Sequence, residues 1–365
     1  MKTRLKNTLS ALMMVPGLSG YEDRVRRAIA ARLDDLGVAH RTDMLGNLIA
    51  SFEGTGPSVM LFAHMDQLGM IVRRIEPDGL LRFERLGGVP ERALPAQAVL
   101  VAVGPGRDVP GVIANKSHHA TTPDEKYQVV PYSELYIDIG ATSADEVRAM
   151  GINIGTPVVY APRVTELAAN RIAGTSVDDR AGCAILLEVA RSLSKRRAGP
   201  PVHLVFSVLE EFNLRGAQPL AQTLQPDIAI QIDLILATDT PDMGARGDVR
   251  LGAGAAMSMY SFHGHGTLNG VIPHPAMVAL IEAAAKTAGL PLQRSAHVGA
   301  LTDLSYVQLA GGGVASIDLG FPMRYSHSAL EVCDLNDLAS LTQLLDHALA
   351  AIGPGFSLDR DDYTQ

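Results

Sequence analysis

The fold class is indicated most clearly by the segment Val202-His203-Leu204-Val205-Phe206-Ser207-Val208-Leu209-Glu210-Glu211. Its largely apolar run is typical of a strand that is buried on both faces. The run ends in two adjacent carboxylates, which are costly to bury unless something such as a pair of cations compensates them. Because the functional crevice of an open α/β sheet lies at the carboxyl ends of its strands, the stretch indicates a buried strand that leads into a polar site.

Two further apolar runs end in the same way. Val59–Ala63 runs into His64 and Asp66. Ile228–Ile232 runs into Asp233. If the three runs are neighbouring strands of one sheet, their ends bring these side chains into a single pocket. The alternative for each run is a solvated strand end whose polar residues face water.

The surrounding sequence alternates helical and strand patterns. A capping box at Ser19–Glu22 predicts a helix that ends near Leu36, where Gly37 follows. Further helices are expected at Ala181–Lys195, Gly216–Leu224, His274–Ala288 and Asp334–Ile352, and strands at Asn47–Phe52, Ser58–Ala63, Val202–Leu209, Asp227–Ile232 and Gly313–Asp318. This alternation predicts an α/β domain with three layers, α/β/α.

Residues 67–167 differ from the rest of the chain. Short β-rich runs alternate there with Gly and Pro, as at Leu80–Phe83, Ala98–Val103 and Pro157–Tyr160, and one short helix is expected at Ser143–Met150. We therefore expect a small all-β, barrel-like domain over 67–167. It would be inserted into a discontinuous catalytic domain formed by 1–66 plus 168–365.

Composition and charge exclude several classes of protein. The chain has 365 residues, of which 47% are hydrophobic and 19% are charged, as in ordinary globular proteins. Its net charge is −8 and its longest basic cluster is Lys195-Arg196-Arg197, so nucleic-acid binding has little support. Cys183 and Cys333 are expected to be buried thiols rather than disulfide partners.

The amino terminus and the apolar runs favour a cytoplasmic protein. Leu5, Leu9, Leu12 and Met13 recur at helical spacing, and Pro16 ends the apolar run too early for a signal peptide. The sequence has no run of the roughly 18 apolar residues that a membrane span needs. We therefore expect an amphipathic first helix, no membrane partner and a cytoplasmic location.

Residues outside the Glu pair also have the chemistry of metal ligands. In His64-Met65-Asp66, the carboxylate is suited to accept the second N–H of a metal-bound imidazole. Asp178-Asp179-Arg180 precedes a predicted helix, where an acidic residue either caps the helix or, at Asp178, bridges two cations. Mixed His and carboxylate ligands suit Zn²⁺, Co²⁺ or Mn²⁺.

Other histidines compete with His64 as metal ligands. His327 follows a predicted strand and loop, and the alternative for it is a surface or capping histidine. The remaining candidates are His118, His119, His203, His263, His265, His274 and His297. Spacing alone does not rank them.

Together these residues resemble the M42 glutamyl aminopeptidase family of two-metal peptidases. The resemblance covers nearly the whole chain, and the order and spacing of its pieces are specific. The pieces are Pro16–Glu22, His64–Gly69, Asp178–Gly182, Glu210-Glu211, Leu214–Ala217, Asp233, Asp239–Pro241, Thr302-Asp303 and Arg324–Ser328. The resemblance implies an aminopeptidase that removes N-terminal residues from peptides with two divalent ions per subunit, Zn²⁺ or Co²⁺ and alternatively Mn²⁺.

The resemblance also implies a set of ligands. His64 and Asp233 would bind one ion, Glu211 and His327 would bind the other, and Asp178 would bridge the two.

Four further residues receive roles from the same resemblance. Glu210 would act as general base and acid, and Asp66 would support His64. His119 would reach towards a neighbouring active site, and Arg324 is a further candidate for substrate contact. The β-rich block would be a dimerisation domain, so the chain would form a homo-oligomer, either a dimer or a tetrahedral dodecamer.

Three alternatives to an aminopeptidase remain at this point. A carboxypeptidase or an N-acyl-amino-acid deacylase would use the same metals, and a non-catalytic scaffold would keep only the fold. A glycosidase would need carboxylates about 5–9.5 Å apart on either side of a sugar bond, which adjacent residues do not naturally provide. Departures from the family pattern at Phe212, Asn213, Ala253 and Ala255 leave the preferred substrate and the assembly open.

Overall fold

The computed structural model describes residues 1–263 and 269–363, and within them twelve strands form one large sheet. These strands are β1 (His40–Thr42), β2 (Leu48–Phe52), β3 (Val59–His64), β10 (Val164–Leu167), β11 (Arg171–Gly174), β12 (Val202–Ser207), β13 (Ile228–Leu236), β14 (Ala255–Phe262), β15 (Gly270–Val271), β16 (Leu292–Val298), β17 (Ala315–Arg324) and β18 (Glu331–Asp334). Their order is β1-β2-β12-β3-β13-β17-β18-β11-β10, and β14 joins β15 and β16 to β17. The pairings of β3 with β12 and β13, and of β13 with β17, are parallel.

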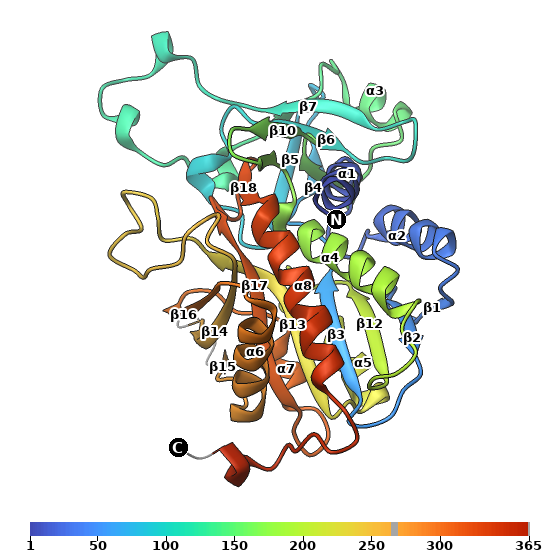
Figure 1. The fold of residues 1–365 in the computed structure, drawn as a ribbon. Coiled ribbons are helices and arrows are strands. Elements are labelled where there is room, and N and C mark those ends of the chain that lie inside the picture. Colours follow the sequence, from blue (N-terminus) through green and yellow to red (C-terminus); the bar gives the residue numbers. More distant parts are fainter. Residues whose placement is uncertain (264–268, 364–365) are drawn as a thin grey trace.

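Helices cover both faces of this sheet. One face carries α1 (Lys2–Met13), α2 (Asp23–Asp35), α4 (Val177–Leu193), α6 (Pro275–Ala288) and α8 (Leu335–Ala351), and the other carries α5 (Ala217–Leu224) and α7 (Leu304–Val307). Figure 1 shows α4, α6 and α8 in front of the sheet. The alternation of β3 explains the layering, because Leu61 packs into the core on the first face and Phe62 into the core on the second. The predicted three-layer α/β/α fold is confirmed.

A closed six-stranded barrel forms the second body of the molecule. Its strands run in the order β4-β5-β8-β7-β6-β9. They are β4 (Gly69–Ile75), β5 (Leu81–Leu86), β6 (Ala98–Val101), β7 (Val109–Ile113), β8 (Ile137–Asp138) and β9 (Pro157–Tyr160), with α3 (Ala144–Ala149) beside them. Figure 1 shows the barrel above the end of the sheet towards which β3 points. The expected barrel-like all-β unit is therefore present.

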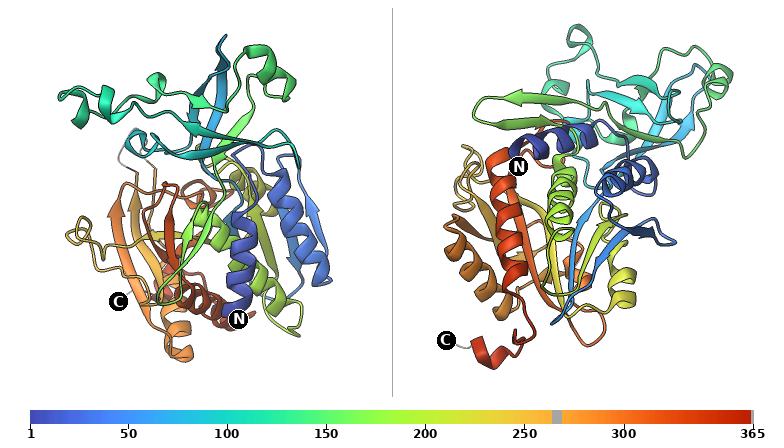
Figure 2. Two further views of the ribbon diagram at one scale, coloured as in Figure 1. Left: turned by 90° about the horizontal axis from the view of Figure 1, so that it is seen from above. Right: turned by 45° about the vertical axis from the view of Figure 1, so that its right-hand side comes forward.

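An arm, residues 114–134, extends from the barrel between β7 and β8 (Figures 1 and 2). It carries three single turns, η2 (His118–Ala120), η3 (Glu125–Tyr127) and η4 (Tyr132–Glu134). We propose that the chain divides into domains of 1–66 plus 168–365 and of 67–167. β10 then lies at the boundary, because it closes the second segment but pairs with β11 of the large sheet.

The expected capping box at Ser19–Glu22 is wrong. α2 begins at Asp23, and the side chains of Ser19 and Glu22 do not cap it. Instead the Ser19 hydroxyl donates a hydrogen bond to Asp66, and Glu22 Oε1 accepts the backbone N–H groups of Gly20 and Leu209 at 2.8 and 3.0 Å. Buried acceptors and donors far away in sequence outcompete the helix end for these two side chains.

The predictions for the first helix and for the two cysteines are confirmed. α1 buries Leu5, Leu9, Leu12 and Met13, as their spacing predicted. Cys183 and Cys333 are buried and free. Among the described residues, no helix combines the length and the apolar character needed to cross a membrane.

Candidate metal centre

Three strands deliver potential ligands to one edge of the sheet. β3 ends at His64, which lies opposite Ser207, the last residue of β12. β13 extends beyond the end of β3. Its pairing with β3 stops at Gln231, whereas its pairing with β17 continues through Asp233. Asp233 therefore stands beside the end of β3, although the strand that carries it continues to Leu236 rather than ending at Ile232 as expected.

The structure brings six of the candidate residues together in two groups. One ligand atom from each member of a group lies within 4.8 Å of the others. The first group is His64, Glu210 and Asp233, and the second is Asp178, Glu211 and His327. Because the six residues come from five separate segments of the chain, no local structural requirement explains their convergence.

Asp178 lies between the two groups. Its Oδ1 is 3.0 Å from Nε2 of His64, and its Oδ2 is 3.6 Å from Nε2 of His327. It lies at the entry to α4, where the backbone of Asp178 and Asp179 is not helical and the peptide bond between them is cis. The two distances place one carboxylate oxygen near each histidine, as a bridging ligand requires.

Each histidine has an acceptor on the far side of its ring, but only His327 makes a hydrogen bond to it, whereas His64 is in charge contact alone. Nδ1 of His327 donates a hydrogen bond to the Gly88 carbonyl at 3.1 Å, and Nδ1 of His64 lies 3.4 Å from Oδ1 of Asp66. In each ring Nε2 then points at Asp178. A metal-bound histidine characteristically has its other ring nitrogen held in this way.

Asp66 also fixes the backbone of the Glu pair. It accepts hydrogen bonds from the backbone N–H groups of Glu210 and Glu211 at 3.1 and 3.0 Å. Burial by itself would raise the pKa of Asp66, but His64, Ser19 and the Glu211 N–H lower that pKa below its usual value. The charged form of Asp66 is therefore favoured, and this carboxylate lies under both His64 and the Glu pair.

The centre concentrates negative charge in a buried place. Burial raises the pKa of Glu211 to about 7, and burial together with neighbouring carboxylates raises the pKa values of Glu210 and Asp233 well above their usual range. Oε1 of Glu211 is buried and has no hydrogen-bond partner among the described residues. Divalent cations would relieve both the repulsion and the unpaired oxygen, and the donor set of imidazoles and carboxylates fits Zn²⁺, Co²⁺ or Mn²⁺.

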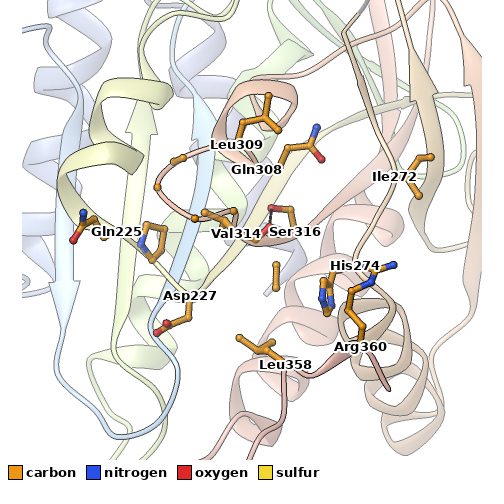
Figure 3. A pocket seen from close by; sticks show the side chains of 16 residues that line it. Gln225, Asp227, Ile272, His274, Gln308, Leu309, Val314, Ser316, Leu358 and Arg360 are labelled. Atoms are coloured by element: carbon orange, nitrogen blue, oxygen red, sulfur yellow. Dashed lines mark hydrogen bonds between the residues drawn. The ribbon is translucent and has the colours of Figure 1, made fainter. Parts of the chain in front are cut away.

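A cavity of about 890 Å³ opens over these ligands. Arg85 and Arg92 from the barrel side and Phe212 and Tyr325 from the sheet side help to line it. Figure 3 shows a second hollow, of about 610 Å³, whose lining includes Asp227 and His274. It lies at the opposite edge of the sheet, because Asp227 directly precedes β13, and none of the six ligand candidates lines it.

The two residues expected to contact substrate lie outside the ligand groups. His119 is exposed in η2 on the arm, and it does not line the cavity of its own chain. Arg324, at the end of β17, donates to both oxygens of Asp239 at 2.7 Å. Its guanidinium is therefore engaged in a bidentate ion pair.

The competing histidines occupy other surroundings. His263 lines the cavity, whereas His265 lies outside the described residues. His203 bonds with Ser51, His297 bonds with Ser295, His274 caps α6, and His118 shares the arm with His119.

Two supporting contacts were not expected from the sequence. The Gly88 carbonyl orients His327, and Glu331 accepts the backbone N–H groups of both Asp178 and His327 at 3.0 and 2.9 Å. The only signal for Gly88 was the Gly87-Gly88 pair itself, which marks a close approach of backbone as well as a turn. Glu331 opens a short strand and had no distinguishing pattern.

Gly88→Ala is expected to weaken metal binding and activity by about tenfold to a hundredfold, the usual cost of disturbing a residue that orients a ligand. A Cβ at position 88 would lie 2.6 Å from Nδ1 of His327, so the ring must move. The comparison is Gly312→Ala, whose Cβ meets no atom within 4 Å. Metal titration of both variants checks the expectation, and unchanged affinity in Gly88→Ala would contradict it.

The fold and the site are those expected of a metal-dependent hydrolase, with candidate metal ligands at the carboxyl edge of an α/β sheet. The sequence model of the M42 glutamyl aminopeptidase family matches residues 46–344, and the chain belongs to this family. The protein SgcX of Escherichia coli is 36% identical over 100% of this chain and 98% of its own.

Solved structures agree with this membership. Aminopeptidase APDkam598 of Desulfurococcus kamchatkensis has a TM-score of 0.91 and 32% identity over 100% of this chain and 98% of its own. The TET1 peptidase of Pyrococcus horikoshii, which can assemble into a tetrahedron or a large octahedral shell, has a TM-score of 0.85 and 29% identity over 95% and 99%. The chain is a metal-dependent aminopeptidase that hydrolyses N-terminal residues from peptides, and the carboxypeptidase, deacylase and scaffold alternatives are not favoured.

Proposed function

We propose that the aminopeptidase works with two divalent ions bridged by Asp178. His64 and Asp233 would hold one ion, and Glu211 and His327 the other. The observation that carries this proposal is the position of Asp178, whose two oxygens lie 3.0 Å from His64 and 3.6 Å from His327. A carboxylate that places one oxygen near each of two histidines is suited to bind two ions, one beside each histidine, rather than a single ion.

We propose that Glu210 moves the proton in the reaction. Its Oε2 lies 4.0 Å from Nε2 of His64, whereas Oδ1 of Asp178 lies 3.0 Å from it, which supports Asp178 rather than Glu210 as the bridging residue. When bound, the ions would polarise the scissile carbonyl and make water acidic enough to lose a proton near neutral pH. Glu210 would accept that proton and pass it to the leaving amine.

The proposal extends to the identity of the ions, the assembly and the location. The ligand set suits Zn²⁺ or Co²⁺, with Mn²⁺ as a further choice, because it mixes nitrogen and oxygen donors without thiolates. A homo-oligomer, either a dimer or a tetrahedral dodecamer, is supported by the assembly of the similar TET1 peptidase. A cytoplasmic location is supported by the free, buried cysteines.

Stabilisation by metal is expected to increase as the pH rises through about 7 and on to about 9, the pKa values of Glu211 and His327 in the folded, metal-free protein. Burial raises the pKa of Glu211 from 4.5 to about 7. Burial lowers the pKa of His327, but Glu211 and Asp178 outweigh it and raise that pKa from 6.5 to about 9. Both folded values exceed the unfolded ones, so in the metal-free protein both groups contribute stability at low pH that is lost as the pH rises through these ranges.

The measurement is the unfolding temperature with and without Zn²⁺ across this pH range. The metal-free protein should lose stability as the pH rises, and the protein with metal should lose less, because metal binding requires the ligands to be deprotonated. The difference between the two temperatures cancels titrating groups outside the site. A difference that stays constant or shrinks with rising pH would count against these ligands.

The proposal is tested by adding ions to protein stripped with a chelator. Activity on an aminoacyl chromogenic substrate should return only as the second equivalent of Zn²⁺, Co²⁺ or Mn²⁺ binds. The matched N-acetylated substrate should stay uncleaved, because it lacks a free α-amine. Full activity with one equivalent would remove the second ion from the mechanism, and cleavage of the acetylated substrate would restore the deacylase alternative.

A further inference from the structure

We infer that Glu331 is a positioning residue that holds the backbone of Asp178 and His327 in place for the ion of the second group. This inference rests on the proposed two-ion function. Oε2 of Glu331 accepts the N–H of Asp178 at 3.0 Å, and Oε1 accepts the N–H of His327 at 2.9 Å. Glu331 is 2% exposed, so water does not compete for these donors.

The topology of the sheet explains how one side chain reaches both ligands. Glu331 is the first residue of β18, which lies between β17 and β11. Gly174, at the end of β11, pairs directly with Glu331, and the chain then continues to Asp178. On the other side, the turn from β17 into β18 carries His327. Both neighbours of β18 therefore deliver a ligand next to its first residue.

Only a carboxylate satisfies both contacts. The two partners are backbone N–H donors, and an ionised Glu offers two acceptor oxygens and no donor. A Gln at this position would accept one N–H and turn its own NH₂ group against the other. Moreover, the backbone of His327 has φ +64°, which is sparsely populated for residues other than Gly and needs support from its surroundings.

Glu331 complements Asp66 on the other side of the centre. Asp66 holds the N–H groups of Glu210 and Glu211, whereas Glu331 holds those of Asp178 and His327. Two of the three members of the second group therefore depend on Glu331. In the first group, by contrast, His64 and Asp233 lie within β3 and β13, where the sheet fixes their backbone.

The test is a calorimetric titration of chelator-stripped, full-length protein with Zn²⁺, comparing wild type, Glu331→Gln and Asp337→Asn. Asp337 is a matched control, because it is 0% exposed and each of its oxygens accepts one backbone N–H at 2.7 Å. Its partners, Gly252 and Gly254, do not line the cavity. Each substitution therefore removes one of the two hydrogen bonds that a buried carboxylate accepts from backbone N–H groups. Only in Glu331→Gln do those N–H groups belong to proposed metal ligands.

We expect two ions in wild type and in Asp337→Asn. In Glu331→Gln, one ion should bind at least about tenfold more weakly while the other keeps its affinity, and kcat should recover when Zn²⁺ is raised. Wild-type affinity for both ions in Glu331→Gln, or an equal loss in Asp337→Asn, would overturn the inference while the two-ion function stands. Fewer than two ions in wild type would overturn the proposed function itself and the inference with it.

A second variant guards against failure to fold. If Glu331→Gln does not fold, Glu331→Asp is titrated in the same way, since it keeps two oxygens on a side chain that is shorter by one methylene. A tenfold loss at one site supports the positioning role, and unchanged affinity at both sites overturns it.

Discussion

Replacing Glu210 with Gln is expected to lower kcat on an aminoacyl substrate by about a thousandfold while the protein still binds two ions. Gln keeps the shape of the side chain but cannot accept and return a proton. Asp66 holds the backbone N–H of Glu210, and this contact survives the substitution. Metal content by elemental analysis and turnover on the same preparation check both halves of the prediction.

Glu188→Gln is a matched control for this result. Glu188 is a buried carboxylate on α4 that pairs with Arg4 at 2.7 Å and does not line the cavity. Its amide variant should keep wild-type kcat even if it is less stable. Near-normal turnover of Glu210→Gln would remove Glu210 from proton transfer. Loss of an ion would instead make Glu210 a ligand, which its place beside His64 and Asp233 permits.

Asp178→Ala is expected to abolish tight binding of both ions and to reduce activity at least about a thousandfold. Wild-type protein with free metal at about a hundred times Kd gains about 2.7 kcal/mol of stability for each ion that binds, and the variant should gain almost none. The reason is that one carboxylate serves both groups. The measurement is the unfolding temperature with and without Zn²⁺, together with metal content. Two tightly bound ions in the variant would contradict the bridging role.

The stability of the metal-free Asp178→Ala variant distinguishes the loss of a metal ligand from damage to the fold. Burial first, and the neighbouring Asp178 after it, raise the pKa values of Glu211, Asp233 and Glu331, so part of each rise is repulsion between buried carboxylates without metal. Removing Asp178 relieves that repulsion. The variant also loses the buried hydrogen bond between Asp178 and His64, so metal-free variant and metal-free wild type should differ in stability by no more than about 1–3 kcal/mol, and a larger loss would point to misfolding.

Much of the fold follows from local patterns of sequence. The runs that became β3 and β12 are largely apolar and lead into polar residues, so their strand character was predictable, although β12 ends at Ser207 and not at the predicted Leu209. β14 and β16 were not expected, because sequences such as Ala-Ala-Met-Ser-Met-Tyr-Ser-Phe lack both a β-branched run and strict alternation. These strands exist because the long β17 offers β14 a pairing edge and β14 in turn offers one to β16.

The candidate ligands were readable because each one interrupts a recognisable pattern, as His64 does at the end of a buried strand. Their supports were not readable. Gly88 and His327 are 239 residues apart, and Glu331 and Asp178 are 153 apart, and in each pair one partner contributes only a backbone atom. Nearly every residue has both a backbone carbonyl and a backbone N–H, so the sequence does not reveal which of these groups will make such a contact. The contacts can be identified only in the folded structure.

The central claim is that Asp178 bridges two ions, and anomalous diffraction from crystals soaked in Zn²⁺ tests it most directly. We predict two peaks about 3.5–4 Å apart, with one oxygen of Asp178 on each. One peak should lie beside His64 and Asp233 and the other beside Glu211 and His327. A single peak, or two peaks that do not share Asp178, would contradict the claim.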